Sequence, residues 1–195
     1  MNRIFNGLII SAVVVLLFIG TWIGNAHSKS SAQDQAYANL SALSLPARRD
    51  AFRAMTDEQR SEILRYHLFK ELNEREGRRE LSGTQHAIIA QTILLVTADF
   101  VAHHGAGTID TLNVQIKEKF TGKDAREIFA QIGGPEPVAR RNHVATDCSC
   151  SRESDYCSLS CAGNGCTTSD YGCGTLWVYS CNGLCRVAVF DDGGQ

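Results

Sequence analysis

The chain has 195 residues, a formal net charge of −2 at pH 7 and hydrophobic residues at 44% of its positions. This is an ordinary globular composition, with room for one medium-sized domain or two small ones. No basic stripe is present, which excludes nucleic acid as the expected partner. From Asp147 onward the chain carries a net charge of −4, against about +2 for the rest, which argues against a cationic C-terminal peptide drawn to anionic lipid.

The N-terminus has the pattern of an export segment. Arg3 precedes a nearly apolar tract over 4–23, and small residues follow it. A basic start, an apolar middle and a small-residue site predict a secretory signal over 1–28, cleaved after Ala26 or Ser28. The same tract is long enough to span a bilayer, so a retained membrane anchor stays open as the alternative. Either form takes the rest of the chain out of the cytoplasm.

Residues 34–133 have the apolar spacing of amphipathic helices. A short helix is predicted after Pro46. Thr56 and Gln59 have the spacing of a capping box, in which the threonine side chain accepts from the first turn and the glutamine side chain reaches back. The helix behind this box is predicted to run to about Glu74.

Three further helices are predicted along the same domain. Ser82 and Gln85 repeat the capping pattern and begin a helix that ends at Gly105. Another spans 109–120, and the last runs over 123–132 and stops at a Gly-Gly-Pro sequence. Short connections between amphipathic helices predict a compact antiparallel bundle.

The helical domain offers few groups for chemistry. Asp99 and His103 are four residues apart on one helical face, and His104 is adjacent, so the three could begin a metal site or an acid–base couple. Nothing supplies the remaining ligands or a nucleophile at a recognisable spacing. The preferred interpretation is polar groups near a helix end, and the same holds for His67 and His86. The sequence predicts no enzyme, no cofactor and no metal site.

A Gly- and Pro-containing stretch over 134–146 follows the helices and is predicted to be an exposed linker, where proteolysis concentrates. It carries Arg140 and Arg141. This pair is either a processing point or an ordinary feature of a linker.

The region 147–190, here called the disulfide module, contains every cysteine of the chain. They are Cys148, Cys150, Cys157, Cys161, Cys166, Cys173, Cys181 and Cys185. An even number of cysteines packed into a short exported segment predicts disulfides. Zinc is the alternative, but no Cys-x2-Cys knuckle occurs and no histidine lies beyond His143.

The end of the module has the pattern of a β-hairpin. Two β-rich runs, 175–181 and 184–190, flank an Asn-Gly pair that suits a two-residue type I′ turn. The predicted fold class is therefore α+β: a signal or anchor helix, a small all-α bundle and a disulfide-rich β-hairpin module.

The hairpin register restricts the disulfide pairing. Cys181 and Cys185 would project to opposite faces, so they are not expected to bond each other. Each is predicted to reach back to the segment 148–173. Cys148 and Cys150 are too close in sequence to bridge comfortably, and the remaining pairing stays open.

Several stretches of the module resemble a known family. They are CSCSRESDYC at 148–157, YGCGTLWVY at 171–179 and CNG at 181–183. These residues closely resemble the bacterial proteins called bacteriocin fulvocin C-related, and a weaker likeness covers 43–52. The resemblance implies an antibacterial peptide released from a larger precursor, and it identifies no target. This chain runs from Tyr179 through Ser180 to Cys181 without the family's additional cysteine, so neither the pairing nor toxicity is carried over.

Two functions stay open. The first is an exported bacteriocin-like precursor, with the helical domain as pro-region and the module as the antibacterial peptide. The second is a non-toxic secreted or membrane-tethered protein that binds a partner through Tyr156, Trp177 or Tyr179, unless these aromatics form the module's core. Either would be secreted, periplasmic or in the cell envelope, tethered by 4–23 if that segment is retained. The expected partner is an unknown cell-envelope component.

Overall fold

The computed structural model describes residues 32–135, 147–157, 160–163 and 165–186. The chain forms two units, Met1–Ala36 and Tyr37–Gln195. Of the first unit only 32–36 are described, and they are helical. All elements below belong to the second unit, whose residues 37–135 are called the helical part. The predicted signal or anchor lies outside the described residues.

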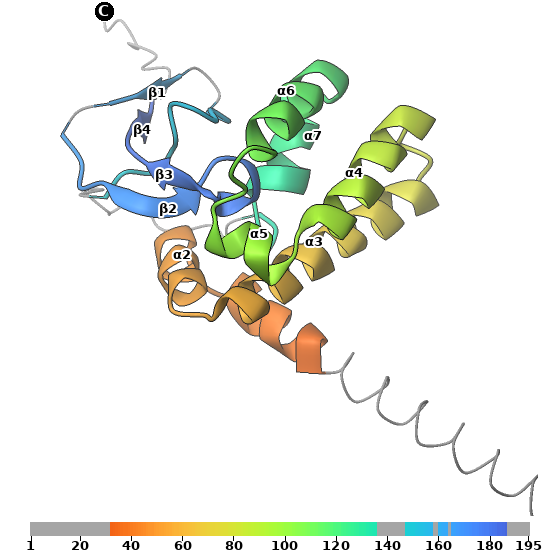
Figure 1. The fold of residues 1–195 in the computed structure, drawn as a ribbon, viewed down its shortest axis with the longest axis horizontal. Coiled ribbons are helices and arrows are strands. Elements are labelled where there is room, and N and C mark those ends of the chain that lie inside the picture. The colour runs from red at the N-terminus through yellow and green to blue at the C-terminus, as the bar shows by residue number, and fades with distance from the viewer. Residues whose placement is uncertain (1–31, 136–146, 158–159, 164, 187–195) are drawn as a thin grey trace, which may run out of the picture. The chain divides into compact units, whose positions relative to one another are not determined.

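The helical part contains helices in the regions where the sequence predicts them (Figure 1). They are α2, Leu45–Arg53; α3, Asp57–Gly77; α4, Gly83–Leu95; α5, Ala98–Ala102; α6, Ile109–Lys119; and α7, Gly122–Ala125, which continues as a π-helix over Arg126–Ala130. Across the portion of the chain that is described, none of the helices combines the length and apolar composition that a bilayer crossing requires.

Both predicted capping boxes are present. The Thr56 side chain accepts from the Gln59 backbone N–H at 3.3 Å, and the Gln59 side chain accepts from the Thr56 backbone N–H at 2.9 Å. Ser82 and Gln85 make the same reciprocal pair at the start of α4. Because the first turn of a helix leaves backbone N–H groups without intrahelical partners, each box satisfies two of them.

The single helix predicted from Ser82 to Gly105 is wrong, because the chain breaks after Leu95. Val96 leaves the helical conformation, with ψ at 86°. Thr97 then caps α5, and its side chain accepts from the Phe100 backbone N–H at 3.1 Å. The break allows the Val96 side chain to be completely buried in the core.

The larger of two hydrophobic clusters extends through the described part of the second unit. Each helix of the helical part contributes to it, and α3 lies against both α4 and α5. Its members include Phe52, Leu64, Leu68, Ile89, Phe100, Ile116, Ala125, Ile128 and Phe129. The same cluster continues into the disulfide module through Leu176, Trp177 and Val178. Helices and module therefore pack around a shared core.

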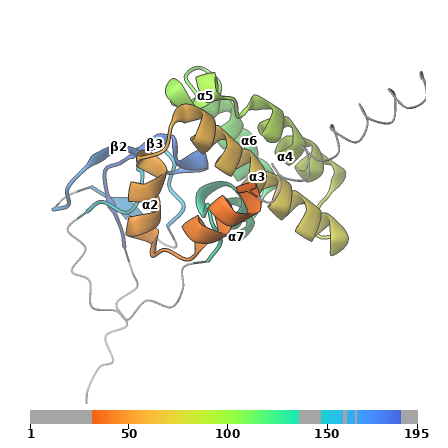
Figure 2. The same cartoon turned by 90° about the horizontal axis from the view of Figure 1, so that it is seen from below.

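The disulfide module contains two short antiparallel strand pairs. β1, Cys161–Ala162, pairs with β4, Leu184–Cys185, and β2, Ser169–Cys173, pairs with β3, Tyr179–Cys181. A 3-10 turn over Thr175–Trp177 connects β2 to β3. Figure 1 and Figure 2 both show β2 beside α2, which places this strand pair against the helical part.

The hairpin predicted around Asn182 and Gly183 is wrong, because β3 and β4 pair with different strands. Neither residue has the positive φ that a type I′ turn needs. Gly183 instead packs so closely that a Cβ there would lie 2.6 Å from the Cys161 Sγ. The Cys150 backbone N–H also donates to the Gly183 carbonyl at 3.0 Å. Gly183 is therefore required for close packing and not for a turn. The end of the predicted second strand, 187–190, lies outside the described residues.

Candidate functional site

All eight cysteines of the disulfide module are paired. The bonds are Cys148–Cys166, Cys150–Cys161, Cys157–Cys185 and Cys173–Cys181. Cys181 and Cys185 are not bonded to each other, and each reaches back into 148–173, as predicted. Cys148 and Cys150 also take separate partners. The framework ties the start of the module to its end, so four cross-links restrict its unfolded chain.

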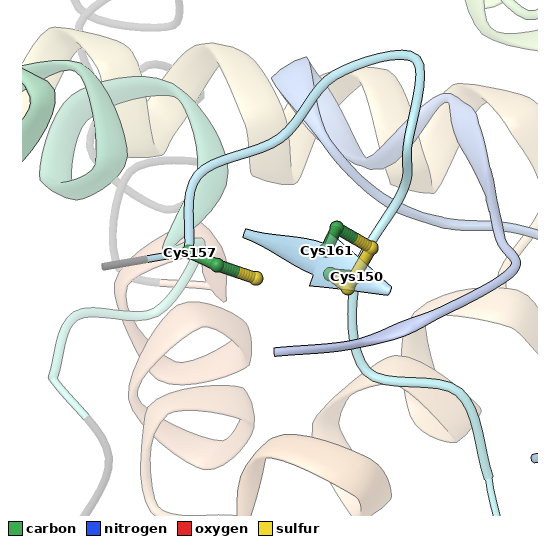
Figure 3. Close-up of side chains that lie close together, drawn as sticks. All are labelled: Cys150, Cys157 and Cys161. Atoms are coloured by element: carbon green, nitrogen blue, oxygen red, sulfur yellow. A yellow bond between two sulfur atoms is a disulfide. The ribbon is translucent and has the colours of Figure 1, made fainter. Parts of the chain in front are cut away.

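Two of these disulfides lie side by side. The sulfur atoms of Cys150, Cys157 and Cys161 are within 4.8 Å of one another, and Figure 3 shows Cys157 beside the bonded pair. Such a cluster resembles a set of metal ligands. Metal binding by cysteine needs thiolates, however, and these sulfur atoms are held in covalent bonds to each other and to Cys185. The cluster follows from the disulfide framework.

Trp177 is the central contact between the module and the helical part. Its side chain is completely buried, and its ring meets that of Phe52 on α2 edge-on, with centroids 5.2 Å apart. The indole Nε1 donates to the Ala130 carbonyl oxygen at 2.9 Å. This hydrogen bond satisfies a carbonyl at the end of the last helix, where no further helical turn follows to provide a donor.

The backbone at this contact is constrained by its surroundings. Leu176 and Trp177 both have positive φ, at 56° and 57°, although neither is a glycine. A left-handed conformation costs a bulky residue about 1–3 kcal/mol and persists only where the surrounding structure determines it. Both side chains are fully buried in the shared core, and this burial holds the turn in place.

A buried polar network lies next to the Trp177 turn. The Asn113 side-chain oxygen, from α6, accepts from the Ser154 hydroxyl at 3.1 Å and from the Thr175 hydroxyl at 2.9 Å. Because the Thr175 hydrogen is used on Asn113, the Tyr156 hydroxyl donates to the Thr175 oxygen, at 2.7 Å. Burial raises the pKa of Tyr156, which keeps this donor protonated. The network fixes the module against α6.

Two further tyrosines join the module to the helices at the edge of this contact. The Tyr179 hydroxyl donates to the Asp110 carboxylate at 2.9 Å, and burial together with this carboxylate raises the pKa of Tyr179. The Tyr171 hydroxyl donates to the Arg53 carbonyl oxygen at 3.1 Å. The Arg60 guanidinium lies over the Tyr171 ring, 4.8 Å from its centroid, in a cation–π contact.

Comparison with known proteins finds a similarity that covers part of the chain. Bacteriocin fulvocin-C of Myxococcus fulvus is 49% identical to the chain in an alignment of 41 residues, and the match covers 19% of this chain and 91% of fulvocin-C. The chain belongs to the fulvocin-C family. The match leaves most of the chain outside it. No protein-family profile matches the chain, and no solved structure does.

The aromatic side chains predicted for partner binding are engaged within the chain itself. In this fulvocin-C-related module, Trp177 and Tyr179 contact the helices, while Tyr156 packs against the shared core. Sequence reasoning missed Asn113 and Tyr171. Asn113 sits among the apolar positions of α6 and is 7% exposed, and a polar residue in that stripe is the signal that could have found it.

The remaining predicted residues include Asp99 and His103 in the described part of the chain and four candidate processing residues outside it. His103 and Asp99 lie at the surface, with the His103 Nδ1 3.3 Å from the Asp99 carboxylate. Within the described ranges, three potential metal ligands cluster only at the disulfide sulfurs of Cys150, Cys157 and Cys161. The candidate processing residues Ala26, Ser28, Arg140 and Arg141 lie outside the described residues.

Proposed function

We propose that this chain is an exported, bacteriocin-like precursor and that its disulfide module is the antibacterial part. The similarity to fulvocin-C carries the proposal, because 91% of that bacteriocin is matched by a segment of the module's length. The four disulfides support it further, since small secreted domains rely on such cross-links. The helical part is then a pro-region, and the protein has no catalytic role.

The proposal places the protein outside the cytoplasm. Disulfides and similarity to a bacteriocin are both consistent with an extracellular or cell-envelope location. Residues 1–28 would serve as a cleaved signal, or 4–23 would remain as an anchor. The target of the module would be a cell-envelope component of a competing bacterium, and nucleic acid is not expected to bind.

Growth inhibition tests this function. Full-length oxidised protein is cut between the two parts, the module is separated in denaturant with its disulfides intact, and the denaturant is then removed. The oxidised module is expected to inhibit growth of a panel of bacteria, whereas the reduced and alkylated module is not, because forty residues need their cross-links to fold. An oxidised module with four confirmed disulfides that inhibits no strain would contradict the proposal.

A second candidate is a non-toxic secreted or tethered protein that uses both parts together. The observation in its favour is the complete burial of Leu176 and Trp177 in a core shared with the helices. Mass spectrometry of culture supernatant separates the two candidates. The mass of a cleaved peptide that starts near Thr146 supports the precursor, and full-length protein alone supports the binding protein.

A further inference from the structure

We propose that the helical part is a binding partner for the disulfide module and that the module stays bound to it after the connecting segment 136–146 is cut. This inference rests on the proposed function. It adds that processing of the chain does not by itself liberate the peptide. Release needs a second event that destroys or displaces the helical part.

After such a cut, only noncovalent contacts hold the module. All four disulfides join cysteines within 148–185, and the chain has no cysteine before Cys148. The module then stays bound only if its contact with the helical part is as well packed and hydrogen-bonded as a stable protein–protein interface.

The contact has the composition of such an interface. Its centre is the fully buried Trp177, which fits between Phe52 and the Ala130 carbonyl. Buried tryptophans with a satisfied indole N–H dominate the binding free energy in many complexes. Tyr171 and Tyr179 lie around this centre and donate hydrogen bonds to the helical part.

Several polar groups at the contact are paired across it. The Asn113 side chain receives hydroxyl groups of Ser154 and Thr175, so separation would remove its hydrogen bonds from the module. At another point the Arg49 guanidinium donates to the Ser149 carbonyl oxygen at 2.9 Å. Charge is favourable as well, because Arg49 and Arg60 contact a module whose net charge over 147–190 is −2.

Separation is unfavourable for both parts. The module would expose Leu176, Trp177 and Val178, which are 0%, 0% and 7% exposed in the chain, on a domain of about forty residues with little other apolar core. The helical part would expose the Phe52 ring. The surface around Phe52, Asn113 and Ala130 therefore acts as a site whose occupant is the module, and it would keep the peptide latent in the cell that makes it.

Cutting the oxidised full-length protein tests this binding. A recognition sequence for a specific protease replaces 140–141, the protein is cut to completion, and the fragments are run on size-exclusion chromatography at low micromolar concentration. The module is expected to co-elute with the helical part. Separation of the wild-type fragments under these conditions would overturn the proposal.

Variants identify the contact that retains the module. In the cut protein, Trp177→Ala is expected to weaken retention by about 30-fold or more, because it removes the central side chain. Tyr179→Phe, which keeps the aromatic ring and removes only the hydroxyl, is expected to weaken it by about 3- to 10-fold through loss of the Asp110 hydrogen bond. Leu94→Ala is the matched control, because Leu94 is 76% exposed. Equal retention in Tyr179→Phe, Trp177→Ala and the control would also contradict the proposal.

The two proposals fail in different ways. If the fragments separate and the isolated module inhibits growth, retention is wrong and the precursor function stands. If the fragments co-elute and the isolated module inhibits no strain, retention stands and the antibacterial function is wrong.

Discussion

At the end of the last helix, three backbone carbonyl groups receive hydrogen bonds from side chains of distant segments. Ile128 accepts from the His67 Nε2 at 3.1 Å, Ala130 accepts from Trp177, and Ile132 accepts from the Arg48 guanidinium at 3.1 Å. Helix ends need such partners when they are buried. These three side chains therefore stabilise the region where the helices meet the module.

The protonation state of His67 follows from its two hydrogen bonds. A carbonyl can only accept, so Nε2 carries the hydrogen, and Nδ1 accepts from the Tyr37 hydroxyl at 2.7 Å. Burial lowers the pKa of His67 to about 4, from an ordinary value of 6.5. The folded state thus holds a neutral imidazole that the unfolded chain would protonate at mildly acidic pH.

Because of His67, the free energy of unfolding is expected to decrease as the pH is lowered. The contribution of His67 is complete above pH 6.5 and is lost as the pH falls toward 4, by on the order of 3 kcal/mol. Urea unfolding between pH 7 and 4 measures the loss. His67→Gln, which keeps a donor and an acceptor but does not titrate, should flatten this part of the profile. His103→Gln, at an exposed position, should leave the loss in place, and an unchanged profile in His67→Gln would contradict the assignment.

The indole hydrogen bond can be tested apart from the size of the side chain. Trp177→Phe keeps an aromatic ring against Phe52 but leaves the Ala130 carbonyl without its donor. We expect the free energy of unfolding to fall by about 1–3 kcal/mol, which is the cost of leaving a buried polar group unpaired. Chemical denaturation followed by circular dichroism measures it. Phe69→Ala, a change at a position 56% exposed, serves as the control and should stay within about 0.5 kcal/mol of wild type.

Among the elements, helix starts could be predicted and strand pairing could not. Capping boxes at Thr56 and Ser82 are local, since the residues that make them are three apart. Strand partners are set by contacts between distant segments, and the disulfides decide them here. The Asn-Gly pair at 182–183 has a strong local preference for a turn, yet β4 pairs with β1, to which Cys161 belongs. Tertiary packing overrode the local preference.

The role of Gly183 gives a test at this scale. Gly183→Ala would place a Cβ 2.6 Å from the Cys161 Sγ and 2.8 Å from the Ala162 carbonyl oxygen. We expect a loss of about 1–3 kcal/mol from overpacking. Thermal or urea unfolding of the oxidised protein measures it, and Gly122→Ala is the control because nothing lies within 4 Å of a Cβ there. Equal stability of the two variants would show that Gly183 is not closely packed.

For the whole molecule, the sequence predicted the helices and the disulfide module, and it predicted that neither Cys181 and Cys185 nor Cys148 and Cys150 bond each other. It did not predict that the helical part and the module pack together. Cysteine content changes abruptly at Cys148, which suggests two separate pieces. The contact between them depends on a left-handed turn at Leu176 and Trp177, which has no local sequence signature, and on Asn113, whose only signal is a polar residue among the apolar positions of α6. A buried tryptophan in the module and a buried Phe52 in α2 are both apolar residues, and only their packing shows that they meet.

The helices and the module share one core, and the fluorescence of Trp177 can test this directly. The chain has two tryptophans, so Trp22→Phe leaves Trp177 as the single tryptophan. Urea unfolding of the oxidised variant is then followed by tryptophan fluorescence, which reports on the module's contact, and by far-UV circular dichroism, which reports on the helices. A shared core predicts coincident transitions with one midpoint. Loss of the buried Trp177 signal at a lower urea concentration than the helical signal would show that the module and the helices are independent.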